Sequence, residues 1–100
     1  MCIHLKEITL PDSLRSIGKN AFTNCIELKK ANLGAGVVSV GEEAFLYDEV
    51  LTELKVPDTA TELGNRIIEG HGEKLTVICA EGSAMETWLK TNYPEVAVKN

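Results

Sequence analysis

Two cysteines, one aspartate and one histidine recur along the chain at a constant interval. Cys2, Cys25, Asp48 and His71 are separated by 23 residues each. If the chain folds into coils of that length, these side chains stack in one row with a spacing of about 4.8 Å. A thiol, a carboxylate and an imidazole in one row could act as the nucleophile, base and orienting group of a hydrolase. The same ligand types could also hold a metal ion.

The surroundings of this row favour a structural role over chemistry. His71 lies between two glycines in an expected loop, and no glycine-rich nucleophile turn or set of oxyanion donors is evident near it. His4 is the other histidine, and Glu42–Glu43 is an adjacent pair of carboxylates that we expect to be solvated. The stretch 34–36 lacks the Lys-Ser/Thr pair of a phosphate-binding loop. We therefore predict no catalytic, cofactor-binding or metal-binding residues.

The three cysteines, Cys2, Cys25 and Cys79, are widely spaced and odd in number. This pattern is not that of a disulfide framework, and it has no zinc-ligand spacing. It predicts free thiols that are buried and act as small apolar side chains.

Composition sets the class of the protein. The chain has 100 residues, of which 44% are hydrophobic and 25% charged, and this composition is typical of a folded domain. Its net charge of −5, without a run of lysine or arginine, argues against nucleic-acid binding. No apolar stretch approaches the roughly 18 residues of a membrane helix, so we expect no membrane insertion. The first residues lack a basic segment followed by an apolar one, so we expect no signal peptide in them.

The whole chain repeats with the same 23-residue period. The apolar positions and one glycine align across three repeats. The aligned sets include Leu5, Leu28 and Leu51; Leu10, Leu33 and Val56; Ile17, Val40 and Leu63; and Gly18, Gly41 and Gly64. This alignment divides the chain into the tail of a truncated repeat (1–4), three repeats (5–27, 28–50 and 51–74), and a terminal strand with a capping helix (75–100).

Each repeat predicts one coil of a solenoid. In the first repeat, residues 8–10 alternate as a short strand and residues 11–13 form a turn. A second apolar pair, in residues 14–17, ends at Gly18, where we expect a turn with positive φ. Residues 21–25 are expected to form a short helical or 3₁₀ turn. Stacking such coils buries a continuous ladder of apolar side chains, in which Phe22 and Phe45 should stack and be almost fully buried.

These positions resemble the BspA-type leucine-rich repeats of secreted and surface proteins. The matching pattern is Leu5-x-x-Ile8-x-Leu10-Pro11-x-x-Leu14-x-x-Ile17-Gly18-x-x-Ala21-Phe22-x-x-Cys25. The second repeat departs from it at Gly34 and Asp48, and the third departs at Ile67, Ile68 and His71. The resemblance implies a leucine-rich repeat solenoid and a role in binding or adhesion at a bacterial cell surface.

A different pattern follows the repeats. Ser83 and Glu86 have the spacing of a capping box, and Met85 and Leu89 lie on one face of the helix that it would start. Residues 95–98 read as a short closing strand. Since a solenoid needs a terminal element over its last core layer, we predict a C-terminal α-helical cap. The predicted fold is thus a repeat solenoid, mainly β with short helical or 3₁₀ turns.

Two groups of outward side chains are the candidate interaction surface. One is the polar row at the strand ends, and the other is a set of apolar residues at the corner of the second repeat. They are Thr9, Asn32 and Lys55, and Leu46, Tyr47 and Val50.

The sequence therefore predicts a non-catalytic module for protein–protein interaction or cell-surface adhesion. The alternatives are a structural spacer or cap of a longer solenoid and, less favoured, a hydrolase using the Cys/Asp/His row. The expected partner is a protein or an extracellular ligand. A homodimer through the uncovered edge of the first repeat is a further expectation. For localisation, the resemblance implies a secreted or surface protein, whereas the chain shows no signal peptide.

Overall fold

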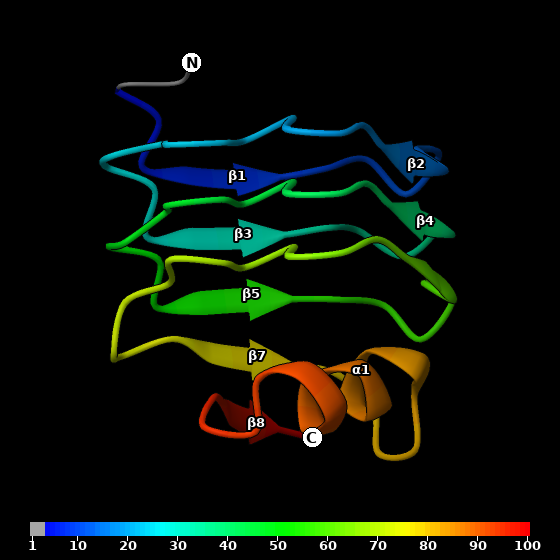
Figure 1. The fold of residues 1–100 in the computed structure, drawn as a ribbon. Coiled ribbons are helices and arrows are strands. Elements are labelled where there is room, and N and C mark those ends of the chain that lie inside the picture. Colours follow the sequence, from blue (N-terminus) through cyan, green and yellow to red (C-terminus); the bar gives the residue numbers. More distant parts are fainter. Residues whose placement is uncertain (1–3) are drawn as a thin grey trace.

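The computed structural model describes residues 4–100, which wind into a solenoid whose coils stack in parallel (Figure 1). One strand from each coil joins a five-stranded sheet with the order β1-β3-β5-β7-β8, and a shorter strand joins a three-stranded sheet with the order β2-β4-β6. The strands are β1 (Glu7–Thr9), β2 (Ser16–Ile17), β3 (Lys30–Asn32), β4 (Ser39–Val40), β5 (Glu53–Lys55), β6 (Glu62–Leu63), β7 (Thr76–Ile78) and β8 (Ala97–Lys99). The helix α1 (Ala84–Asn92) lies at the C-terminal end of the stack.

The strand register reproduces the sequence period. Ile8 pairs with Ala31, Ala31 with Leu54, and Leu54 with Val77, so each step down the large sheet is 23 residues. All pairings are parallel, because the chain runs in the same direction each time it passes through a sheet. The solenoid predicted from the repeat pattern is confirmed.

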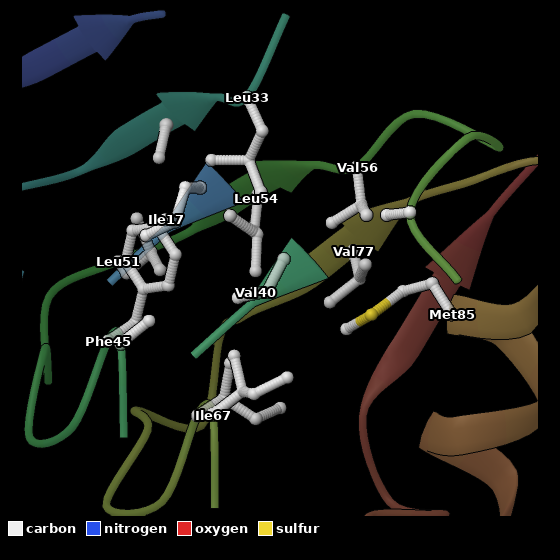
Figure 2. Close-up of a cluster of buried hydrophobic side chains, with 14 of the residues drawn as sticks. Ile17, Leu33, Val40, Phe45, Leu51, Leu54, Val56, Ile67, Val77 and Met85 are labelled. Carbon is white, nitrogen blue, oxygen red and sulfur yellow. The ribbon is translucent and has the colours of Figure 1, made fainter. Parts of the chain in front are cut away.

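The core is a ladder of apolar side chains between the two sheets (Figure 2). Phe22 and Phe45 stack as predicted, with ring centroids 5.4 Å apart and an interplanar angle of 15°. Phe45 is 1% exposed, but Phe22 is only partly buried. The prediction of near-complete burial was therefore wrong for Phe22, because its ring belongs to the outermost coil and is covered on one side. Ile67 and Ile68, which replace the Ala-Phe pair in the third coil, are each 1% exposed and keep that turn packed.

The glycine column, defined as Gly18, Gly41 and Gly64, was predicted to have positive φ, and this was wrong. Positive φ occurs instead at two other positions in each coil. The first set comprises Asn20 (59°), Glu43 (58°) and Arg66 (54°), and the second comprises Asn24 (58°), Tyr47 (59°) and Gly70 (77°). The left-handed residues thus follow the glycine and shape the corner between the two sheets.

The glycines serve close stacking of the coils instead. A Cβ atom built on Gly41 would lie 2.6 Å from the backbone nitrogen of Lys19, and one on Gly64 would lie 2.6 Å from that of Glu42. Each glycine therefore lets its coil approach the backbone of the coil before it. At Gly18 no described atom lies within 4 Å of such a Cβ.

We expect Gly41→Ala to destabilise the fold. The added methyl group must push two backbones apart, and overpacking of this kind costs about 1–3 kcal/mol. Urea titration followed by circular dichroism measures the loss. Gly18→Ala is the matched control, since its methyl group meets open space, and an equal loss in both variants would contradict the stacking explanation.

The predicted cap is confirmed in its main features. Ser83 is the N-cap of α1, and its side chain accepts a hydrogen bond from the Glu86 backbone N–H at 3.3 Å. Met85 and Leu89 are each 1% exposed against the last core layer. The closing strand β8 occupies 97–99, where residues 95–98 were predicted, and it extends the large sheet in parallel with β7.

The helix also closes the end of the small sheet. The indole N–H of Trp88 donates to the carbonyl of Gly64 at 3.2 Å. Glu86 accepts hydrogen bonds from the Gly82 backbone N–H at 2.9 Å and from the side-chain amide of Asn100 at 3.1 Å. These hydrogen bonds lower the pKa of Glu86, with the Gly82 N–H as the largest cause. The hydrogen bond from Trp88 to Gly64 thus gives the tryptophan a structural role in the cap. The hydrogen bonds of Glu86 tie the start of the helix to Asn100.

Candidate functional site

The polar row predicted from the sequence borders a shallow groove on the large sheet. Strand register places Thr9 beside Asn32, and Asn32 beside Lys55. All three line a hollow of about 300 Å³, which we call the sheet groove. Its remaining lining residues come from the turns that follow the strands, and they are Asp12, Gly34, Ala35, Pro57 and Asp58.

The sheet groove combines charges of both signs with a rigid floor. Asp12 is held in place, because its Oδ1 accepts a hydrogen bond from the backbone N–H of Ala35 at 2.9 Å in the next coil. Asn32 is held by the N–H of Gly34, which donates to its Oδ1 at 3.0 Å. Lys55 is exposed, and its ammonium group makes no ion pair with a described residue. The groove therefore presents fixed acceptors and one unpaired cation.

Asp12 and Asp58 were not among the residues selected from the sequence. The signal that could have identified them was present, because Pro11-Asp12 recurs as Pro57-Asp58. A repeated turn next to the polar row must lie at the rim of the same face.

The apolar corner group is only partly brought together. Tyr47 is 52% exposed and Val50 is 40% exposed, whereas Leu46 is half-buried. The ring of Tyr47 packs close to Gly70 of the next coil, where a Cβ would fall 2.3 Å from its Cδ1. Val50 instead shares a hollow of about 250 Å³ with Ile26, which is 55% exposed.

Ile26 is a surface residue that the sequence reasoning missed. It follows Cys25, and the positions 23 and 46 residues later, Glu49 and Gly72, are not apolar. Because Ile3 stands 23 residues before it, this column mixes apolar and polar types, and the period alone did not mark Ile26 as a surface residue. The rest of the hollow that it shares with Val50 is polar, and it is lined by Lys6, Glu27 and Lys29.

The row of Cys25, Asp48 and His71 does not form a relay. Asp48 is 1% exposed, and its Oδ1 accepts a hydrogen bond from the backbone N–H of Cys25 at 2.7 Å. His71 makes its hydrogen bonds outside this row: its Nε2 lies 2.9 Å from a carboxylate oxygen of Glu95, and its Nδ1 lies 2.8 Å from the carbonyl of Gly72. The hydrogen bond from His71 is the largest of the causes that lower the pKa of Glu95.

Asp48 is nevertheless an unusual core residue. Its Oδ2 is buried and has no hydrogen-bond partner among the described residues. Burial raises the pKa of Asp48 to about 7, against the smaller opposing effect of the Cys25 N–H. The carboxyl group therefore loses its charge far more readily than a surface aspartate.

The cysteines depart from the prediction of free thiols in one case. Cys25 is 0% exposed and is disulfide-bonded, so it cannot serve as a thiolate nucleophile in this state. Cys2, the other cysteine of the row, lies outside the described residues. Cys79 is a buried free thiol, and burial is the main cause that raises its pKa. The prediction of a free thiol was therefore wrong for Cys25. It rested on the odd number and wide spacing of the cysteines, which do not exclude a single disulfide.

Further features bear on the class of site. Within residues 4–100, no group of three or more His, Cys, Asp or Glu side chains is arranged to hold a metal ion. No helix in this part of the chain is long and apolar enough to span a membrane.

Comparison with known proteins identifies the class of repeat. Residues 1–86 match the model of the BspA type leucine rich repeat region, described with 6 copies. Because this match covers most of the chain, the protein belongs to the BspA-type leucine-rich repeat family. Repeats of this family generally serve protein interaction and surface functions. No curated protein and no solved structure matches the chain.

Proposed function

We propose that this protein is a non-catalytic binding module whose recognition surface is the sheet groove. The observation that carries the proposal is the row of Thr9, Asn32 and Lys55, which the strand register sets side by side over a rigid sheet. Solenoids present such rows as extended surfaces for macromolecules. The unpaired Lys55 favours a protein partner that brings a carboxylate to the groove, in adhesion at a cell surface or in another protein contact.

Charge reversal in the groove tests this proposal. The immobilised full chain is screened against an array of extracellular and surface proteins, and dissociation constants are measured for each hit. We expect Lys55→Glu to weaken a genuine partner at least about tenfold, which corresponds to about 1.4 kcal/mol. Lys74→Glu, on a corner outside the sheet groove, is the matched control and should leave binding within about twofold. Partners that bind both variants equally would contradict the assignment of the groove.

A second candidate function is that of a structural segment of a longer solenoid. One observation favours it: the apolar side chains of the first coil are only partly buried, whereas their counterparts in the second coil are almost completely buried. The partly buried residues are Leu5, Ile8, Leu10, Leu14 and Phe22; the counterparts, each at most 2% exposed, are Leu28, Ala31, Leu33, Val37 and Phe45.

A further inference from the structure

The corner at which the chain enters the large sheet carries two lysines side by side. Lys6 directly precedes β1 and Lys29 directly precedes β3, so both lie at the strand starts, whereas the sheet groove lies at the strand ends (Figure 1). The backbone N–H of Lys29 donates to the carbonyl of Lys6 at 2.8 Å, which holds these residues next to each other in neighbouring coils. We call Lys6 and Lys29 the lysine pair. Both are exposed, and neither makes an ion pair within residues 4–100.

The lysine pair is unfavourable for the fold taken alone. Like charges that lie directly opposite each other on neighbouring strands are destabilising. The third coil offers no counter-charge, because its residue at this position is Thr52, whose N–H donates to the carbonyl of Lys29 at 2.8 Å. The adjoining column shows the contrast, since the strand register sets Glu7, Lys30 and Glu53 side by side with alternating charge. The described residues therefore give the lysine pair no stabilising role.

The lysine pair borders two hollows. One is the hollow of Ile26 and Val50 described above, which both lysines line. The other has a volume of about 570 Å³, and its lining residues are His4, Lys6, Glu7, Lys29, Lys30 and Thr52. Because the same two side chains line both hollows, we treat them as one surface. We call it the lysine corner.

The apolar part of the lysine corner is also exposed. Ile26 and Val50 come from different coils, and they are two of the three large apolar side chains that are exposed among the described residues. Exposed apolar side chains that gather on a surface mark interaction sites. The lysine corner thus combines two unpaired cations with an apolar contact area.

Two carboxylates border the lysine corner, and each has a basic side chain as its neighbour. Glu7 stands beside Lys30 in the strand register. Oε2 of Glu27 lies 3.8 Å from Nδ1 of His4. The lysine pair has no such neighbour of opposite charge in its own column. A carboxylate from outside the chain would therefore meet the lysine pair without displacing an internal ion pair.

We propose that the lysine corner binds an acidic segment of a partner protein, in which two closely spaced carboxylates contact Lys6 and Lys29 and a neighbouring apolar side chain packs on Ile26 and Val50. Charge-assisted hydrogen bonds from ammonium groups to carboxylates are the strong ones in such a contact. They also turn the repulsion within the lysine pair into attraction to a shared partner. The apolar neighbours favour a peptide over a sulfated sugar or a phosphate head group, because Ile26 and Val50 offer packing and no side-chain hydrogen bond.

This inference is independent of the sheet groove, with which the lysine corner shares no lining residue. A phage-displayed library of short random peptides is selected on the immobilised full chain. Dissociation constants of the selected peptides are then measured by calorimetry for the wild type and three variants. Lys6→Glu reverses one charge of the lysine pair, and Ile26→Ser removes part of the apolar contact. Lys55→Glu, in the sheet groove, is the matched control.

We expect the selected peptides to carry neighbouring acidic residues next to an apolar one. Lys6→Glu should weaken their binding at least about tenfold. It should leave the melting temperature unchanged or higher, because a glutamate at this position stands beside Lys29. Ile26→Ser should weaken binding about threefold or more, and Lys55→Glu should leave it within about twofold. Binding should also fall as the salt concentration rises.

Several results would overturn the proposal. The library could yield no peptide, or only peptides without acidic residues. Lys6→Glu and Lys55→Glu could weaken binding equally, which would indicate a general effect of charge, and loss with Lys55→Glu alone would place the peptide in the sheet groove. Finally, a heparin fragment or phosphatidylserine vesicles could bind more tightly than the peptides and lose that binding in Lys6→Glu. A sulfated sugar or a membrane surface would then be the occupant.

Discussion

Phe45→Ala is expected to lower the free energy of unfolding by about 3–5 kcal/mol. Phe45 is 1% exposed, and its ring stacks on Phe22 in the coil above. Removing it leaves a cavity between two layers, and the parallel backbones on either side are tied by hydrogen bonds and cannot collapse into it. Domains of this size have about 5–15 kcal/mol of stability in total, so the variant should be close to unfolding. Urea denaturation followed by circular dichroism measures the loss.

Two companion variants keep this experiment decisive. Phe22→Ala removes the stacked partner from the outermost coil, where the ring is already partly exposed, and it should cost clearly less than Phe45→Ala. Phe45→Leu retains most of the volume, so it should remain folded even if the alanine variant does not. If Phe22→Ala cost as much as Phe45→Ala, the difference in burial between the two coils would not hold in solution.

Replacement of Asp48 by asparagine is expected to remove a large part of the pH dependence of stability. The pKa of Asp48 is raised to about 7 in the folded protein, from an ordinary value of 3.8. Between these two values the folded state keeps the proton and the unfolded state does not. The stabilising contribution is thus complete below about pH 4, and it is lost as the pH rises through about 7.

The expected size of this effect is about 2–4 kcal/mol between pH 4 and pH 8, on the scale of about 1.4 kcal/mol for each pKa unit. Asparagine retains an oxygen that can accept the Cys25 N–H, but it cannot ionise. We therefore expect the unfolding free energy of Asp48→Asn minus that of the wild type to rise over this pH range.

Urea titrations at several pH values provide that difference, in which the contributions of Glu86 and Glu95 cancel. Asp58→Asn removes an exposed carboxyl group in the third coil, and it is the control for the loss of one carboxylate. A flat difference for Asp48→Asn, or the same profile for both variants, would contradict a buried carboxyl group with a raised pKa.

The repeat period by itself determined the architecture of this protein. Leucine, isoleucine and valine at 23-residue spacing can bury their side chains only if successive coils stack in register, and the structure pairs Ile8, Ala31, Leu54 and Val77 in that register. The cap was also predictable, since the Ser83–Glu86 box and the Met85–Leu89 face depend on residues close in sequence. The side-by-side placement of Thr9, Asn32 and Lys55 follows from the same register.

Only the tertiary structure showed what particular residues do at their positions. The glycine column reads equally well as a turn with positive φ or as a close approach, because glycine permits both. The choice depends on the distance between the backbones of two coils. Likewise, the period places Asp48 and His71 in one row, but side-chain rotamers turn His71 toward Glu95 and leave Asp48 buried with an unpaired oxygen. Periodicity determines which backbones are neighbours, whereas the direction of a side chain depends on contacts with residues from other coils, and these contacts have no signature in the repeat.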